Sequence, residues 1–157
     1  MINFRSYSNL TKVVIPNSVQ LSTKNYTNAF KNMRNLVEVQ LPVDKITIMR
    51  NMFYNCASLK AAVCGDKVTD LSQAYRNCTN LTTAVCGDKV TNMSGAYQGC
   101  TNLTTAVCGP NVTELGSSYY NCTNLTTAVC GPNVTNMYAA YYGCTNLTTA
   151  VCGPNVT

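Results

Sequence analysis

Hydrophobic and polar residues follow one short pattern that returns at a regular interval along the chain. Each copy opens with a leucine, places apolar residues three and five positions later, and fills the gaps with polar or small residues. The opening leucines are Leu10, Leu36, Leu59, Leu81, Leu103, Leu125 and Leu147, and from Leu59 onward they recur every 22 residues. A repeat of this length predicts a solenoid, in which each copy forms one turn and covers its neighbours.

Within each copy the pattern predicts a short strand followed by a return arm. Leu81, Ala84 and Cys86 alternate with polar residues and are expected to point inward from a strand. A Gly or Pro corner ends the strand, and the arm then carries Val, Met, an aromatic residue and Cys. The arm is short and rich in Asn, Thr and Gly, which favours turns, a 3-10 turn or a single helical turn over a regular helix.

The repeats predict one elongated domain over residues 1–157, with divergent turns in 1–58 and regular 22-residue turns in 59–157. Its core is expected to be thin, because Ala and Cys occupy two of the three inward strand positions in the regular turns. No signal peptide is visible, and no stretch approaches the roughly 20 apolar residues of a membrane helix.

The segment from Val90 to Leu103, Val-Thr-Asn-Met-Ser-Gly-Ala-Tyr-Gln-Gly-Cys-Thr-Asn-Leu, resembles the BspA-like, or Treponema-type, leucine-rich repeat. The pattern covers almost the whole chain, except that family strands usually hold Leu or Ile where this chain has Ala and Cys. The resemblance implies a curved right-handed solenoid with one parallel sheet face. It also implies a role at a bacterial surface, in adhesion.

Charge is confined to the first part of the chain. All 11 Lys and Arg residues and five of the six acids lie in residues 5–89, and Glu114 carries the one later charge. A neutral C-terminal half lacks the charge repulsion that usually opposes association. We interpret it either as the result of duplicating one neutral repeat or as an interface. The basic residues are neither clustered nor interleaved with an aromatic platform, so nucleic acid is an improbable partner.

Ten cysteines form two ladders that are expected to be structural. Cys64, Cys86, Cys108, Cys130 and Cys152 lie on the strands, and Cys56, Cys78, Cys100, Cys122 and Cys144 lie on the return arms. Free thiols that pack as small hydrophobes are the favoured interpretation. In-register strands hold their Cβ atoms roughly 4.8 Å apart, which is unsuited to disulfides, although pairing between the ladders under oxidation stays open. Zinc spacings are absent, so no metal is expected.

Outward strand positions predict a flat ladder of threonine and valine on the sheet face. Its candidate binding residues are Thr83, Val85, Thr105, Val107, Thr127, Val129, Thr149 and Val151. Ice binding through such a ladder is a minor alternative, because Thr and Val are also ordinary strand formers.

Tyrosines form a second candidate surface on the return arms. Tyr54, Tyr120, Tyr138 and Tyr142 are expected to be exposed beside Asn and Ser, which is the composition of an adaptable binding surface. Tyr75, Tyr97, Tyr119 and Tyr141 stand at the aromatic core position of the repeat.

Catalysis is not expected. The chain has no His and six acids, which excludes a His-dependent triad, and no Gly-rich phosphate loop precedes a helix. No cofactor is expected.

Two classes of function remain. The first is a recognition or adhesion module that binds a protein or glycan at a bacterial cell or virion surface. The second is a structural building block of a virion or filament, which self-associates end to end through uncapped terminal turns and the neutral half.

Overall fold

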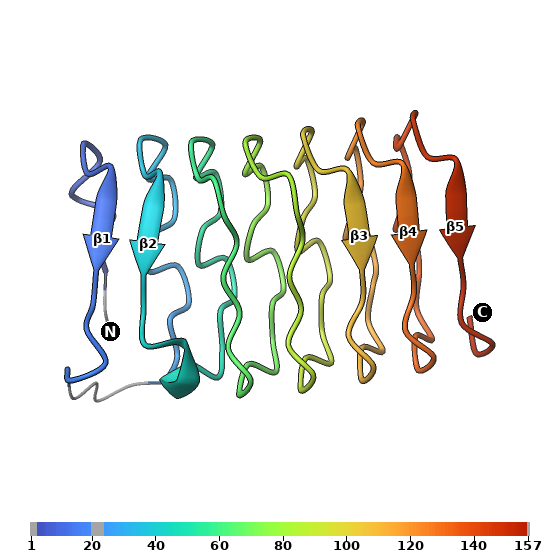
Figure 1. The fold of residues 1–157 in the computed structure, drawn as a ribbon, viewed down its shortest axis with the longest axis horizontal. Coiled ribbons are helices and arrows are strands. Elements are labelled where there is room, and N and C mark those ends of the chain that lie inside the picture. Colours follow the sequence, from blue (N-terminus) through green and yellow to red (C-terminus); the bar gives the residue numbers. More distant parts are fainter. Residues whose placement is uncertain (1–2, 20–23, 157) are drawn as a thin grey trace.

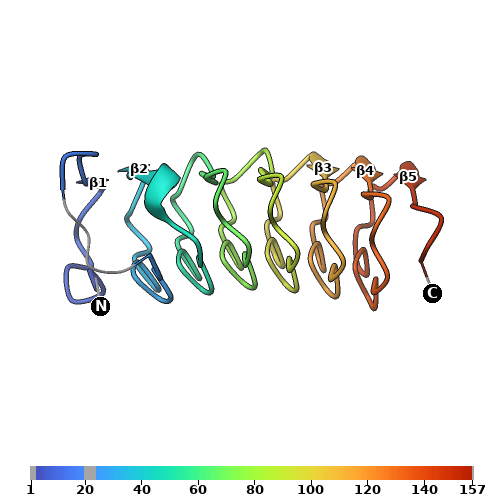
Figure 2. The ribbon, with the colours of Figure 1, turned by 90° about the horizontal axis from the view of Figure 1, so that it is seen from below.

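A computed structural model of the chain describes residues 3–19 and 24–156, and these residues coil into a solenoid (Figure 1). Successive turns stack side by side, with the strand segments on one face and the return arms behind them (Figure 2). The predicted repeat solenoid is confirmed. No helix among the described residues is both long enough and apolar enough to cross a bilayer.

Among the described residues, five short strands form two parallel sheets on the strand face (Figure 1). The first sheet pairs β1 (Lys12–Val14) with β2 (Glu38–Gln40), and the second orders β3 (Thr105–Val107), β4 (Thr127–Val129) and β5 (Thr149–Val151). Equivalent residues of successive repeats are in register, as Thr105, Thr127 and Thr149 show. A 3-10 helix, η1 (Val43–Lys45), follows β2.

Strands were also expected at Leu59–Cys64 and Leu81–Cys86, but neither segment forms a strand, and the second meets β3 only through a single bridge from Thr83 to Thr105. In each segment a tyrosine hydroxyl from the return arm of the same turn bonds the backbone. The Tyr97 hydroxyl donates to the Val85 carbonyl at 2.7 Å and accepts from the Val85 N–H at 2.9 Å, and Tyr75 does the same at Val63. These backbone groups therefore bond a side chain in place of a neighbouring strand.

The return arms consist of consecutive turns. From the second turn onward, each arm holds two residues with positive φ four positions apart, such as Asn51 at 51° and Asn55 at 60°. A helix would require negative φ at these positions, so the arm cannot become a helix. Single parallel bridges join neighbouring arms in a second ladder, which runs through Asn25, Ile48, Asp70, Asn92, Glu114 and Asn136.

Side chains at equivalent positions of successive turns stack inside the coil. The aromatic rings of Phe4, Phe30, Phe53, Tyr75, Tyr97, Tyr119 and Tyr141 lie parallel, with neighbouring centroids 5.0 to 5.8 Å apart. The repeat leucines from Leu36 to Leu125 are fully buried. Offset-stacked rings stabilise by about 0.5–1.5 kcal/mol a pair beyond their burial, so the aromatic column is a main source of cohesion between turns.

Candidate functional site

Of the tyrosines predicted to be exposed, Tyr138 and Tyr142 are exposed, whereas Tyr120 is half-buried. Tyr138 and Tyr142 are 81% and 64% exposed. The rings of Tyr120 and Tyr142 are stacked with centroids 4.9 Å apart, because these residues occupy equivalent positions in neighbouring turns. We call Tyr120, Tyr138 and Tyr142 the tyrosine surface.

The fourth predicted tyrosine, Tyr54, lies apart from this surface and is half-buried. Its ring carries a cation on each side, with Lys31 Nζ 4.6 Å and the Arg76 guanidinium carbon 5.4 Å from the centroid. Lys31 and Arg76 hold the equivalent positions of the turns on either side. Such contacts stabilise by about 0.5–1 kcal/mol at exposed sites, so this ring is already engaged within the chain.

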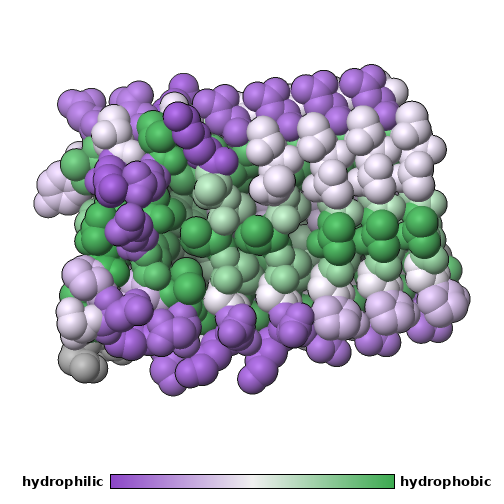
Figure 3. Space-filling model, viewed as in Figure 1, coloured by the Kyte–Doolittle hydropathy of each residue, from purple (hydrophilic) through white to green (hydrophobic). Residues whose placement is uncertain are grey.

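The predicted Thr–Val ladder is regular over three turns. Val107, Val129 and Val151 on β3, β4 and β5 are between 36% and 54% exposed, and they form the hydrophobic stripe over these strands in Figure 3. Thr83 joins this sheet through a single bridge to Thr105, and Val85 is half-buried. The flat ladder thus begins one turn later than expected, because the Tyr97 hydroxyl occupies the Val85 backbone.

Near β1 and β2 the same face carries hydrophilic side chains among hydrophobic ones (Figure 3). Lys12 Nζ lies 2.9 Å from the Glu38 carboxylate, and this hydrogen bond lowers the pKa of Glu38. On the return arms, Arg50 pairs with Asp70 of the next turn at 2.6 Å. Two of the basic side chains of the N-terminal half, Lys12 and Arg50, are therefore paired with a carboxylate of the following turn.

The two cysteine ladders occupy different environments, and all ten cysteines are free thiols. Each arm cysteine donates its S–H to the carbonyl of the aromatic residue one turn earlier, as Cys100 does to Tyr75 at 3.1 Å. The same bond joins Cys56, Cys78, Cys122 and Cys144 to Phe30, Phe53, Tyr97 and Tyr119. Burial raises the pKa of the Cys56 thiol to about 12 and those of Cys78 and Cys100 well above 9.

The strand cysteines are less uniform. Cys64, Cys86 and Cys108 are half-buried, Cys130 is buried and Cys152 is exposed. The Cys130 sulfur lies 3.2 Å from the Tyr141 hydroxyl, and hydrogen bonds from the Cys108 thiol and from Tyr141 lower the pKa of Cys130. Residues 3–19 and 24–156 contain no group of three or more His, Cys, Asp or Glu side chains able to hold a metal ion.

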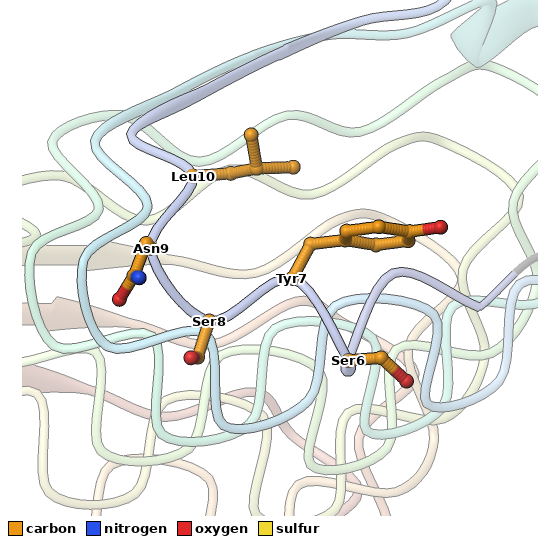
Figure 4. Close-up of a pocket in the computed structure, with 5 residues that line it drawn as sticks. All are labelled: Ser6, Tyr7, Ser8, Asn9 and Leu10. Atoms are coloured by element: carbon orange, nitrogen blue, oxygen red, sulfur yellow. The ribbon is translucent and has the colours of Figure 1, made fainter.

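A pocket of about 310 Å³ lies at the first turn and is lined by residues 6–10 (Figure 4). The Tyr7 ring and the Leu10 side chain extend to the same side of this loop. Leu10 is 38% exposed, whereas its equivalents from Leu36 to Leu125 are fully buried between turns. The pocket therefore marks the open end of the leucine ladder.

A groove of about 620 Å³ on the side where the strands end was not predicted. Its walls are two columns of equivalent residues: Lys89, Asn111, Asn133 and Asn155 on one, and Thr69, Thr91, Thr113 and Thr135 on the other. The signal was present in the sequence as the repeated triplet Lys/Asn-Val-Thr, which places two polar side chains on one side of a buried valine in every turn.

The chain matches the model of the BspA type leucine rich repeat region in six copies, over residues 2–117 and 73–157. Comparison with curated proteins gave no match.

Three solved structures share the fold. A leucine-rich repeat protein of T. pallidum is 24% identical with a TM-score of 0.80, over 90% of this chain and 69% of that chain. A leucine-rich repeat protein from Bacteroides ovatus is 17% identical with a TM-score of 0.75, over 98% of this chain and 40% of that one. A leucine rich cell surface protein from Faecalibacterium prausnitzii is 18% identical with a TM-score of 0.52, over 91% of this chain and 32% of that chain.

The chain thus spans about two thirds of the T. pallidum structure and less than half of each of the other two. Leucine-rich repeats are in general non-enzymatic modules for protein interaction, and those of the BspA type are typically associated with bacterial surfaces. With a family model matched over nearly its whole length, the chain belongs to the BspA-type leucine-rich repeat family.

Proposed function

We propose that this chain is a non-enzymatic recognition or adhesion module that binds a protein partner at a bacterial cell or virion surface through its tyrosine surface. The observation that carries the proposal is the exposure of Tyr138 and Tyr142 to 81% and 64% in a part of the chain with almost no charge. Protein interfaces are enriched in tyrosine and depleted of charge at their centres, which is the chemistry of this surface.

The tyrosine surface suits recognition for an energetic reason. A tyrosine has two side-chain torsions, so a partner that covers it gains a large contact area at a small entropic cost. The Tyr120–Tyr142 stack restrains the rings further before any partner binds. Preorganisation of this kind raises affinity because less freedom is lost on binding.

The proposal is tested with a double variant, Tyr138→Ser and Tyr142→Ser, in a pull-down from surface proteins of host cells followed by binding measurements on the captured protein. Loss of two tyrosine anchors should weaken binding about 100-fold, since each anchor contributes about 2 kcal/mol or less. Tyr7→Ser is the matched control, because Tyr7 is 61% exposed but lies in the first turn.

Unchanged affinity of the double variant, or an equal loss in Tyr7→Ser, would contradict the assignment of the binding surface. A structural building block that assembles through the neutral sheet face of β3, β4 and β5 is the second candidate. The exposed valine stripe without neighbouring charges favours it, and its test is a measurement of self-association.

A further inference from the structure

We propose that the groove between the Lys/Asn column and the threonine column is a binding site for a linear, neutral glycan. It is distinct from the tyrosine surface and goes beyond the function proposed above. The groove crosses equivalent positions from Thr69 to Asn155. Its volume of about 620 Å³ lies within the usual range of ligand sites.

Local backbone geometry directs both columns toward the groove. Asn111 and Thr113 flank Val112, which is fully buried, so the two polar side chains share the outer side of the chain. Asn133, Val134 and Thr135 repeat the arrangement one turn later. The site therefore consists of one small unit repeated along the solenoid axis, and a polymer with repeating units fits it better than a compact molecule.

Hydrogen bonds between turns decide what the walls offer to a ligand. The side-chain N–H groups of Asn111, Asn133 and Asn155 donate to the carbonyls of Asp88, Pro110 and Pro132 at 2.8, 2.9 and 3.0 Å. Their amide oxygens accept no hydrogen bond from the described part of the chain, so each Asn keeps its oxygen as an acceptor and its second N–H as a donor.

The threonine wall has the same character. The hydroxyls of Thr91 and Thr113 donate to the carbonyls of Thr69 and Thr91 at 3.4 and 3.3 Å. Each hydroxyl has then used its proton and keeps two acceptor lone pairs. Between them the two walls present acceptors at every turn and a free amide N–H at each Asn, so a ligand that both donates and accepts hydrogen bonds matches them.

The charges of the groove narrow the ligand class. None of the lining residues is acidic, and Lys89 is the single charged one. A polycation would find no carboxylate there, and a polyanion would find one cation followed by uncharged amides. Sugar hydroxyls supply donors without charge, and the threonine methyl groups give the apolar surface against which the C–H faces of sugar rings pack.

The test uses the full chain and an array of linear neutral oligosaccharides, including cellohexaose, xylohexaose and mannohexaose, with polygalacturonate as the acidic comparison. Dissociation constants of the ligands that bind are then measured by calorimetry. The double variant Thr91→Val and Thr113→Val keeps the methyl groups and removes two wall hydroxyls. It should weaken binding about fivefold for each hydroxyl, the effect of one net hydrogen bond.

A matched control separates binding from folding. Thr104→Val with Thr126→Val removes two hydroxyls that donate to Thr82 and Thr104 at 3.3 and 3.1 Å, an equivalent ladder outside the groove. This pair should lose no affinity. Lys89→Gln should leave the binding of neutral glycans within about twofold.

Three outcomes would overturn the proposal: no neutral oligosaccharide binds at millimolar concentration, both threonine pairs lose affinity equally, or polygalacturonate binds best and Lys89→Gln abolishes its binding. A protein partner that is lost in the Tyr138→Ser, Tyr142→Ser variant but kept in the groove variant would leave the tyrosine surface intact. Failure of one proposal is therefore distinguishable from failure of the other.

Discussion

Individual residues in the return arms are selected by backbone conformation. The positions at positive φ are filled by Asn in the early turns and by Gly, Gln, Ser, Ala and Asn later. Asn and Gly adopt this region at the lowest cost, whereas Ala139 and Ser117 adopt it only because the adjoining turns hold them there. The arm is therefore as dependent on a few special residues as on its hydrophobic contacts.

Gly143→Ala should destabilise the chain by about 1–2 kcal/mol, because Gly143 has φ of 75° and a Cβ there would meet Asn121 Oδ1 at 2.1 Å. The free energy of unfolding from urea titration measures the effect. Gly116→Ala is the control, since its φ is not positive and the nearest atom would be 3.8 Å from the new Cβ. Equal free energies of unfolding of the two variants would contradict this prediction, because alanine would then adopt the left-handed conformation at position 143 without cost.

At the scale of the element, the tyrosine hydroxyls decide where the sheet forms. Tyr75 and Tyr97 bond the strand backbone and interrupt the sheet, while the equivalent early position, Phe53, has no hydroxyl and faces an intact β2. The Tyr119 hydroxyl is buried without a hydrogen-bond partner among the described residues, and β3 forms beside it. The strand is therefore absent where the tyrosine hydroxyl bonds the backbone and present where it does not.

Two phenylalanine variants should change stability in different ways. Tyr97→Phe removes the partner of the Val85 N–H and C=O and should cost about 1–3 kcal/mol. Tyr119→Phe removes a buried hydroxyl that lacks a partner, and should leave stability unchanged or raise it by about 1 kcal/mol. Urea unfolding of both variants provides the comparison, and a loss of similar size in each would contradict this account of the sheet.

The arm cysteine ladder should make stability depend on alkaline pH. Burial raises the pKa of Cys56 to about 12 in the folded chain, above the ordinary value of 9.0. Above pH 9 the unfolded chain loses its thiol protons while the folded chain keeps them, so stability is constant below this pH and falls as the pH rises. Each such cysteine removes about 1.4 kcal/mol per pH unit between these values.

Unfolding titrations from pH 7 to pH 10.5 measure this slope. Cys56→Ser keeps a donor for the Phe30 carbonyl but does not titrate in this range. The free energy of unfolding of this variant should therefore fall less steeply with pH, by about 1.4 kcal/mol per pH unit, which is what one cysteine contributes. A wild-type stability that stays level to pH 10.5 would refute the linkage.

At the scale of the whole molecule, charge divides the solenoid into two halves. The sheet face carries charged side chains near β1 and β2 and a neutral valine stripe over β3 to β5 (Figure 3). A neutral apolar face has little electrostatic repulsion against a second copy, so we expect association that rises with protein concentration.

Val129→Lys should shift this association to at least tenfold higher concentration, because it places a charge in the stripe where two copies would meet. Light scattering over a concentration series measures the change. Val14→Lys is the matched control, since Val14 is also an exposed outward residue of a strand but lies on β1 beside Lys12. A chain that stays monomeric at millimolar concentration would exclude both the association and the structural role built on it.

The sequence by itself determined the solenoid, the inward leucines and aromatics and the family, because a pattern repeated over many turns leaves few arrangements that bury the same positions each time. It also located Tyr138, Tyr142 and the Thr–Val ladder. The tertiary structure decided where the sheet breaks, since that depends on a hydroxyl of Tyr97 reaching the backbone of Val85 12 residues away. It also decided the groove, because its walls arise when residues 22 apart stack, and hydrogen bonds between turns use the proton of each Thr hydroxyl and leave its oxygen as an acceptor.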